Sequence, residues 1–187
     1  MAVRSGMADL IVSWRLLVND AGTATWSNQQ AQDILDEHQT RVWREPLEME
    51  KTYTSGTSYV YKVYHSRYRN LEAGGSAYFQ VEDSAGSQRG TADFTADYIR
   101  GVVTMTADQV GTALYLSGYA YDLHGAAADG WRQQAGNVAG YYSFEADGHR
   151  LSRSDWFKHC IQMASLMDAQ AQPVSVRAWR NGDFDRE

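Results

Sequence analysis

The sequence contains a single cysteine and no long hydrophobic run, and each shortage argues against a class of protein. The one cysteine, Cys160, excludes an internal disulfide, and we expect it to be a small buried residue of a helix. A membrane-spanning helix needs about 18 consecutive apolar residues, and no apolar run of this sequence comes close to that length. We therefore expect no contact with a membrane. Met1 to Gly6 show no cleavable signal pattern, which favours an intracellular protein.

The chain also lacks an excess of basic residues. It has 17 Lys and Arg against 23 Asp and Glu, which gives a net charge of −6, and no block of clustered basic residues occurs. Contacts with phosphates need such clusters, so we do not expect this chain to bind nucleic acid by itself. A position beside DNA inside a larger assembly remains compatible with this charge.

Signatures of catalysis and metal binding are absent as well. The five histidines are scattered, and neither a His-Glu-x-x-His nor a Cys-x-x-Cys pair occurs. No serine lies in a glycine-framed nucleophile elbow, and Gly74-Gly75 lack the lysine of a phosphate loop. We interpret Asp122 as the N-cap of a helix rather than as a catalytic carboxylate. The sequence therefore predicts a protein that is not an enzyme and holds neither metal nor cofactor.

What the chain does contain is a pair of helical patterns between Tyr121 and Met167, joined by a reversal at Asp147-Gly148. In the first helix, apolar residues recur every three or four positions, which is typical of one buried face. Several glycines share this run. Because glycine costs a helix about 1 kcal/mol relative to alanine, their presence indicates a close approach of neighbouring backbones. The candidates for this packing, within or between protomers, are Gly125, Ala128, Trp131 and Tyr142.

The second helix is predicted to begin after the N-cap Ser152 and to end before Pro173. One stripe of this helix carries Trp156, Cys160, Ala164 and Met167, with Phe157 and Ile161 beside it. We interpret the two helices as an αα-hairpin against which the rest of the chain packs.

Two further helices are predicted in residues 1–45. The first covers Ala8 to Val18 and is too short to be stable alone, so it must pack on something. The second begins at Ser27, with Gln30 in the position that completes a capping box, and fades at Thr40.

From about Val42 the apolar period changes from helical spacing to alternation, and we assign the inserted strands to residues 46–119. Tyrosine, valine and threonine alternate with polar residues, and glycine-containing turns recur at about eight to twelve residues. This pattern predicts short antiparallel strands in a small sheet or sandwich. The expected fold class is therefore α+β, a small helical bundle with a central antiparallel insertion, divided into segments 1–45, 46–119, 120–170 and 171–187.

The last segment, 171–187, is predicted to be an extended arm. It mixes apolar and charged residues without a clear period, and burial of each of its two large aromatic side chains would remove about 150–250 Å² from water. Either the chain's own core or another subunit must cover them, and we favour a partner. The candidate partner-binding residues are Val174, Val176, Arg177, Trp179, Arg180 and Phe184.

Three stretches carry a resemblance to a known family. They are Ser27 to Val42, Tyr121 to Gly148, and Leu151 to Ser154 with the helix that follows. Together they cover about half of the chain, and in this order they resemble the head–tail connector (adaptor) proteins of tailed bacteriophages. The insertion and the first twenty or so residues match this family more loosely.

The resemblance implies a structural role at the head–tail interface of the virion, with the host cytoplasm as the location during assembly. Connector proteins of this family form a ring of about twelve copies beneath the portal protein. Their C-terminal arms bind the portal, the other face of the ring receives a neck, stopper or tail component, and DNA passes through the lumen without sequence recognition. The long tyrosine-rich insertion exceeds a minimal helical adaptor, and we expect it to make ring or capsid contacts.

Two other functions fit the same residues. The chain could be a stand-alone binding module, in which Tyr59, Tyr61 and Tyr78 form an exposed aromatic face for a glycan or a peptide. It could also be another neck or tail-completion protein of the same virus, which would differ from a connector in the position of its docking surface.

Overall fold

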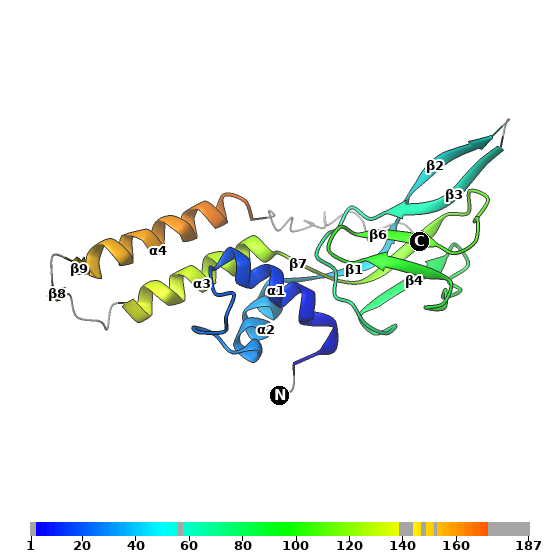
Figure 1. Cartoon of the computed structure of the whole chain (residues 1–187). Coiled ribbons are helices and arrows are strands. Elements are labelled where there is room, and N and C mark those ends of the chain that lie inside the picture. The colour runs from blue at the N-terminus through cyan, green and yellow to red at the C-terminus, as the bar shows by residue number, and fades with distance from the viewer. Residues whose placement is uncertain (1–2, 56–57, 139–143, 147–148, 152, 172–187) are drawn as a thin grey trace, which may run out of the picture.

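The computed structural model describes residues 3–55, 58–138, 144–146, 149–151 and 153–171 (Figure 1). In this part of the chain a helical lobe and a β lobe lie side by side, and β7 leads directly into α3. The predicted α+β class, with antiparallel strands inserted between helices, is confirmed. The predicted arm falls almost entirely outside the described residues.

The helical lobe is built around α3, because α1, α2 and α4 all pack against it. Its elements are η1 (Ser5–Met7), α1 (Ala8–Leu17), α2 (Asn28–Glu37), α3 (Leu123–Val138) and α4 (Arg153–Asp168). Ser27 caps α2 as predicted: its hydroxyl oxygen accepts from the Gln30 backbone N–H at 3.2 Å, and the Gln30 side chain accepts from the Ser27 backbone N–H at 2.8 Å. Among the described residues, no helix is both long and apolar enough to cross a lipid bilayer.

The β lobe is a sandwich of two antiparallel sheets with strand orders β1-β7-β4 and β2-β3-β6-β5. Its strands are β1 (Gln39–Pro46), β2 (Glu48–Ser55), β3 (Ser58–His65), β4 (Phe79–Asp83), β5 (Phe94–Asp97), β6 (Val102–Met105) and β7 (Leu114–Tyr121). Both sheets contribute to one core: Phe79 and Leu116 come from the first sheet, and Tyr64, Phe94 and Val103 from the second. This core is separate from the core of the helical lobe.

Two element boundaries differ from those expected. The α2 helix ends at Glu37 and β1 begins at Gln39, before the helix end expected at Thr40 and the change of period expected at about Val42. The reason is non-local, since β1 pairs along β7 from Gln39↔Tyr121 onwards and buries Val42 in the β core. Between α3 and α4 the chain also forms a short hairpin, β8 (Phe144–Ala146) and β9 (His149–Leu151), where we expected only a reversal at Asp147-Gly148, which lies outside the described residues.

The two lobes are joined by a charged cluster around Arg4. Its guanidinium donates to Asp36 of α2 at 2.5 Å and 2.8 Å, and to the buried carboxylate of Glu72 at 2.8 Å. It also donates to the hydroxyl of Tyr121, which in turn donates to Glu72 at 2.6 Å. Burial, together with this bond to Glu72, raises the pKa of Tyr121 above its usual range. The side chain of Glu72 is only 1% exposed, so its charge depends on Arg4 for compensation.

The backbone on both sides of this cluster is closely packed. A Cβ atom on Gly6 would lie 1.5 Å from the carbonyl oxygen of Ala73, and the Ala73 backbone N–H donates to the Gly6 carbonyl at 3.3 Å. The start of the chain is thereby held against the segment that leads from β3 towards β4.

The substitution Arg4→Ala is expected to lower the free energy of unfolding by about 3–5 kcal/mol, because Glu72 would remain buried without its cation. Denaturant unfolding followed by tryptophan fluorescence measures this change. Arg100→Ala is the matched control, since Arg100 is 82% exposed and 3.7 Å from Asp97, and it should change the free energy by no more than about 0.5 kcal/mol. Equal losses in the two variants would contradict the role assigned to Arg4.

Candidate interaction surfaces

The residues that we expected to bind partners are distributed unevenly in the structure. Six of them, Val174, Val176, Arg177, Trp179, Arg180 and Phe184, belong to the arm and lie outside the described residues, as does Tyr142. The structure places the remaining three, Gly125, Ala128 and Trp131, on α3, and all three are buried within the protomer.

The small residues of α3 let other elements approach its backbone closely. A Cβ atom on Gly130 would lie 2.9 Å from the Trp14 ring and 3.0 Å from Val18, so α1 and the residue that follows it occupy the space left by this glycine. The indole N–H of Trp131 donates to the carbonyl of Leu17 at 3.1 Å. The close packing that the sequence indicated is therefore made inside one protomer at these positions.

The start of α3 is fixed by Asp122, as predicted. One carboxylate oxygen of Asp122 accepts from the backbone N–H groups of His124 and Gly125, both at 3.1 Å. These bonds satisfy two of the donors that a helix start leaves without a partner. The position of α3 relative to β7 is thus set by an N-cap.

A chain of polar contacts then joins three helices. The ring of His38, at the end of α2, lies 2.8 Å from Asp129 of α3, and Arg132 bonds both to Asp129 and to Asp168 of α4. Burial alone would raise the pKa of Asp129, but the hydrogen bonds from His38 and Arg132 outweigh burial and lower it. Among the described residues, no group of three His, Cys, Asp or Glu side chains is placed to hold a metal ion.

The α4 helix exposes apolar side chains beside the face that packs on α3. Cys160, Ala164 and Met167 are buried against α3, and burial raises the pKa of the Cys160 thiol. Phe157 is 42% exposed and Ile161 is 40% exposed. These two side chains lie one helical turn apart, and a hollow beside Phe157 is lined by Arg153, Ser154 and Lys158. We call Phe157 and Ile161 the α4 flank.

Trp156 also differs from the expected burial. We expected it on the stripe of Cys160, but it is 43% exposed and stacks on the ring of His159, with ring centroids 5.3 Å apart. His159 in turn makes an edge contact with Trp131 at 5.7 Å. The rings of Trp131, His159 and Trp156 therefore form a continuous series from the helical core to the surface of α4.

The β2–β3 pair extends beyond the sandwich as a two-stranded ribbon (Figure 1). β3 pairs with β6 only at residues 63–65. Beyond that point Tyr53 and Tyr59 are exposed and contact each other edge to face at 5.8 Å, and the ammonium of Lys51 lies 3.8 Å from the centre of the Tyr59 ring. A two-stranded ribbon is marginally stable alone, so contacts of this kind are needed to order it.

The structure does not bring Tyr59, Tyr61 and Tyr78 onto one face. Tyr59 and Tyr61 lie on β3, in the second sheet. Tyr78 precedes β4 of the first sheet and packs beside Tyr119 at 6.2 Å, with the guanidinium of Arg4 5.7 Å from its ring centre.

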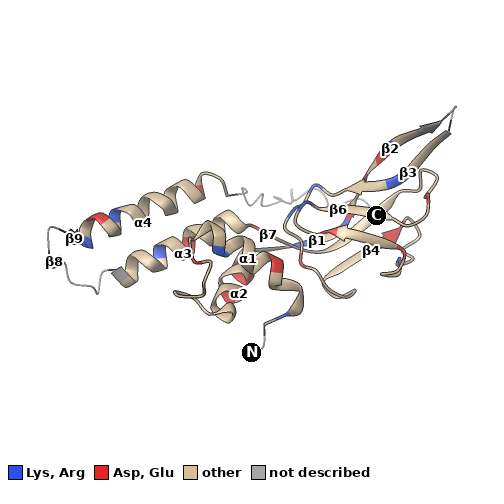
Figure 2. Cartoon of the chain, in the orientation of Figure 1, with Lys and Arg blue, Asp and Glu red and all other residues tan. Residues whose placement is uncertain are grey.

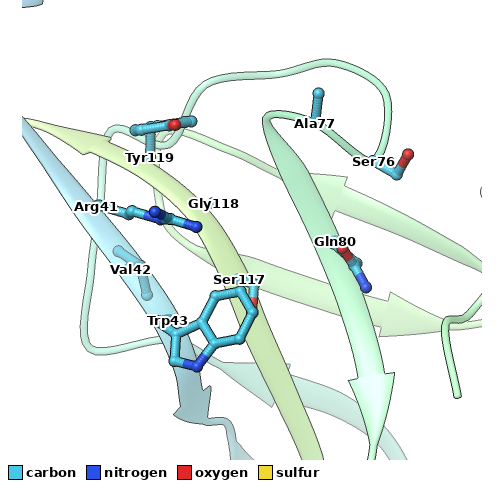
Figure 3. A pocket seen from close by; sticks show the side chains of 9 residues that line it. All are labelled: Arg41, Val42, Trp43, Ser76, Ala77, Gln80, Ser117, Gly118 and Tyr119. Carbon is cyan, nitrogen blue, oxygen red and sulfur yellow. The ribbon is translucent and has the colours of Figure 1, made fainter. Parts of the chain in front are cut away.

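The first sheet carries a cleft on its outer face that the sequence analysis missed (Figure 3). Its floor is formed by β7 at Ser117 and Gly118, and Trp43 and Arg41 of β1 line one side. Gln80 of β4 lies across from them. We call this site the Trp43 cleft. Trp43 is 69% exposed, and the Arg41 guanidinium lies 5.5 Å from its ring centre.

An irregularity in β1 accounts for the exposure of Trp43. The register with β7 shifts between Val42 and Glu45. Arg44 has φ +44°, in the left-handed region of backbone conformation that residues other than glycine rarely adopt. Three contacts hold this conformation: the Arg44 backbone N–H donates to Ser117 at 3.0 Å, and its guanidinium lies 3.1 Å from Glu82 and 5.2 Å from the Tyr115 ring centre. The only sign of this cleft in the sequence is the position of Trp43 between Arg41 and Arg44 in a strand pattern.

Comparisons of the chain with protein-family models, with curated proteins and with solved structures gave no match.

The substitution Gly130→Ala is expected to lower the free energy of unfolding by about 1–3 kcal/mol, because the added methyl group would push against Trp14 and Val18. Gly136→Ala on the same helix is the matched control. Nothing lies within 4 Å of a Cβ there, so it should raise the free energy by about 0.4–1 kcal/mol. Denaturant unfolding of both variants measures the difference, and a stabilised Gly130→Ala variant would rule out the tight contact between α1 and α3.

Proposed function

We propose that this chain is a ring-forming structural connector at the head–tail interface of a tailed bacteriophage virion. In this proposal it has no enzymatic activity and no cofactor. Its partners are the portal protein, about twelve copies of itself, and a neck, stopper or tail component. DNA passes through the lumen of the ring without sequence recognition.

The α4 flank is the observation that supports this proposal best. A ring is closed by heterologous contacts, so each protomer must present one surface that its neighbour covers with a different surface. Phe157 and Ile161 are exposed side by side on a helix whose other face is packed on α3. Covering each of them would contribute about 1.5–3 kcal/mol at most, which is modest for one contact but is repeated around a ring.

The charge of the chain is compatible with a channel for DNA. Lys and Arg residues are spread over both lobes and do not gather on one element of the described chain (Figure 2). With a net charge of −6, such a ring would not hold the passing phosphates through a basic stripe.

The arm of residues 171–187 is proposed to bind the portal through Val174, Val176, Arg177, Trp179, Arg180 and Phe184. A single arm with few anchors binds weakly, but arms on a ring act together because binding of one raises the effective concentration of the others. This part of the proposal rests on the sequence, since these residues lie outside the described part of the chain.

Deleting residues 174–187 is expected to leave a folded protein that no longer binds the portal protein encoded with it. Native mass spectrometry of the mixture measures this: the full chain should add the mass of a ring of copies to the portal, and the truncated chain should stay free. Circular dichroism of the truncated chain checks the fold. Normal attachment of the truncated chain would show that the arm is not the portal-binding element, and binding to a tail component instead of the portal would favour a tail-completion protein.

The double substitution Phe157→Ser, Ile161→Ser is expected to abolish ring formation on the portal, because it removes the apolar α4 flank. Both side chains are at least 40% exposed, so the midpoint of thermal unfolding should change little. Val110→Asn is the control: Val110 is 83% exposed in the β lobe and has φ +51°, a conformation that asparagine tolerates. The control should form complexes of the same mass as the original chain, and the ring proposal would fail if the double variant did so too.

A further inference from the structure

We propose that the Trp43 cleft is a binding site for a single sugar ring, the terminal residue of an uncharged glycan. This inference does not depend on the connector function, because it rests on the outer face of the β1-β7-β4 sheet alone. Three properties of the cleft support it: an exposed aromatic platform, polar side chains without partners, and a small volume.

The platform is the indole of Trp43. One face of a pyranose ring presents C–H groups, and such a face packs well on an aromatic ring that water solvates poorly. Trp43 is 69% exposed although Arg41 lies over its ring, so an aromatic surface remains open to solvent. Figure 3 shows the indole and the Arg41 guanidinium lying side by side along β1.

The polar side chains around the platform match the hydroxyl groups of a sugar. Gln80, Ser76 and Tyr119 line the cleft, and within the described residues their side-chain polar atoms have no hydrogen-bond partner. An amide group and hydroxyl groups both donate and accept, as sugar hydroxyls do. The lining contains no carboxylate, so nothing in it favours a cationic ligand.

The volume limits what can bind. The cleft holds about 200 Å³, below the about 300–1,000 Å³ of sites for drug-sized ligands. A single ring fits this volume, and a longer glycan would extend from the open side into solvent.

The backbone holds the platform in place before a ligand arrives. An arginine with a left-handed backbone is strained, and such strain persists where surrounding contacts fix it. Here the backbone hydrogen bond from Arg44 to Ser117 and the ion pair of its guanidinium with Glu82 do so. Because the indole is already positioned on a paired sheet, little ordering is needed when a ligand binds.

Two other ligand classes fit the cleft less well. An added peptide strand pairs along the edge of a sheet, whereas this cleft lies on the outer face over the central strand β7, which is paired with β1 and with β4. A nucleic acid needs several cations for its phosphates, and Arg41 is the only basic residue in the lining of this cleft.

The test is an NMR titration of the full ¹⁵N-labelled chain with glucose, galactose, N-acetylglucosamine and rhamnose, each up to about 100 mM, since single rings bind with millimolar affinity. We expect at least one sugar to shift the indole N–H signal of Trp43 and the side-chain amide signals of Gln80. Its methyl glycoside should bind equally well if the natural ligand is a terminal glycan residue; binding of the free reducing sugar alone would overturn that part of the proposal.

Trp43→Ala should weaken this binding by at least about tenfold, whereas Trp43→Phe should retain most of it, because phenylalanine keeps an aromatic face. Tyr53→Ala is the control, because Tyr53 is a similarly exposed aromatic residue on the ribbon, and it should bind as the original chain does. The proposal is overturned if no sugar shifts Trp43, if Trp43→Ala binds unchanged, or if a proline-rich peptide or a single-stranded oligonucleotide shifts Trp43 where the sugars do not.

Discussion

The buried carboxylate of Glu72 needs a cation, and this cation is the guanidinium of Arg4, which is distant from Glu72 in the sequence. The same guanidinium reaches Asp36 on α2 and Tyr121 at the end of β7. A buried ion pair contributes little net stability relative to an apolar pair of similar shape, but it tolerates few alternative geometries. The helical and β lobes, each with its own core, are therefore fixed relative to each other by this polar cluster as well as by the apolar contacts of Ile99 and Tyr119 with the helical core.

This division gives the two lobes different surfaces. In the helical lobe, Gly125 and Gly130 of α3 face His38 and α1 inside the protomer. Apolar side chains remain exposed on the α4 flank and, on α1, at Val12 and Leu16. In the β lobe, the exposed aromatic residues are separated: Tyr53 and Tyr59 lie on the ribbon, and Trp43 lies on the outer face of the other sheet. Contacts that assemble copies and contacts that bind a small ligand can thus coexist on one chain.

Local rules predicted the parts of the structure that depend on neighbours in sequence. The Ser27–Gln30 capping box and the Asp122 N-cap follow from side chains within three residues of the groups they bond. Non-local pairing set what the sequence could not predict. β1 replaces the end of the expected helix because β7, far along the chain, pairs with it. The Trp43 cleft escaped prediction for the same reason, since its exposure depends on a register shift and on a left-handed Arg44 that contacts β7 and β4.

The β lobe is entered and left at one place, because Gln39 and Tyr121 are paired neighbours at the ends of β1 and β7. From the helical side, everything between them behaves like a long hairpin loop whose ends are already together. Another folded unit with adjacent termini could be joined at this position if it supplied Arg4 with a carboxylate in place of Glu72. The chain thus offers a natural position for domain grafting.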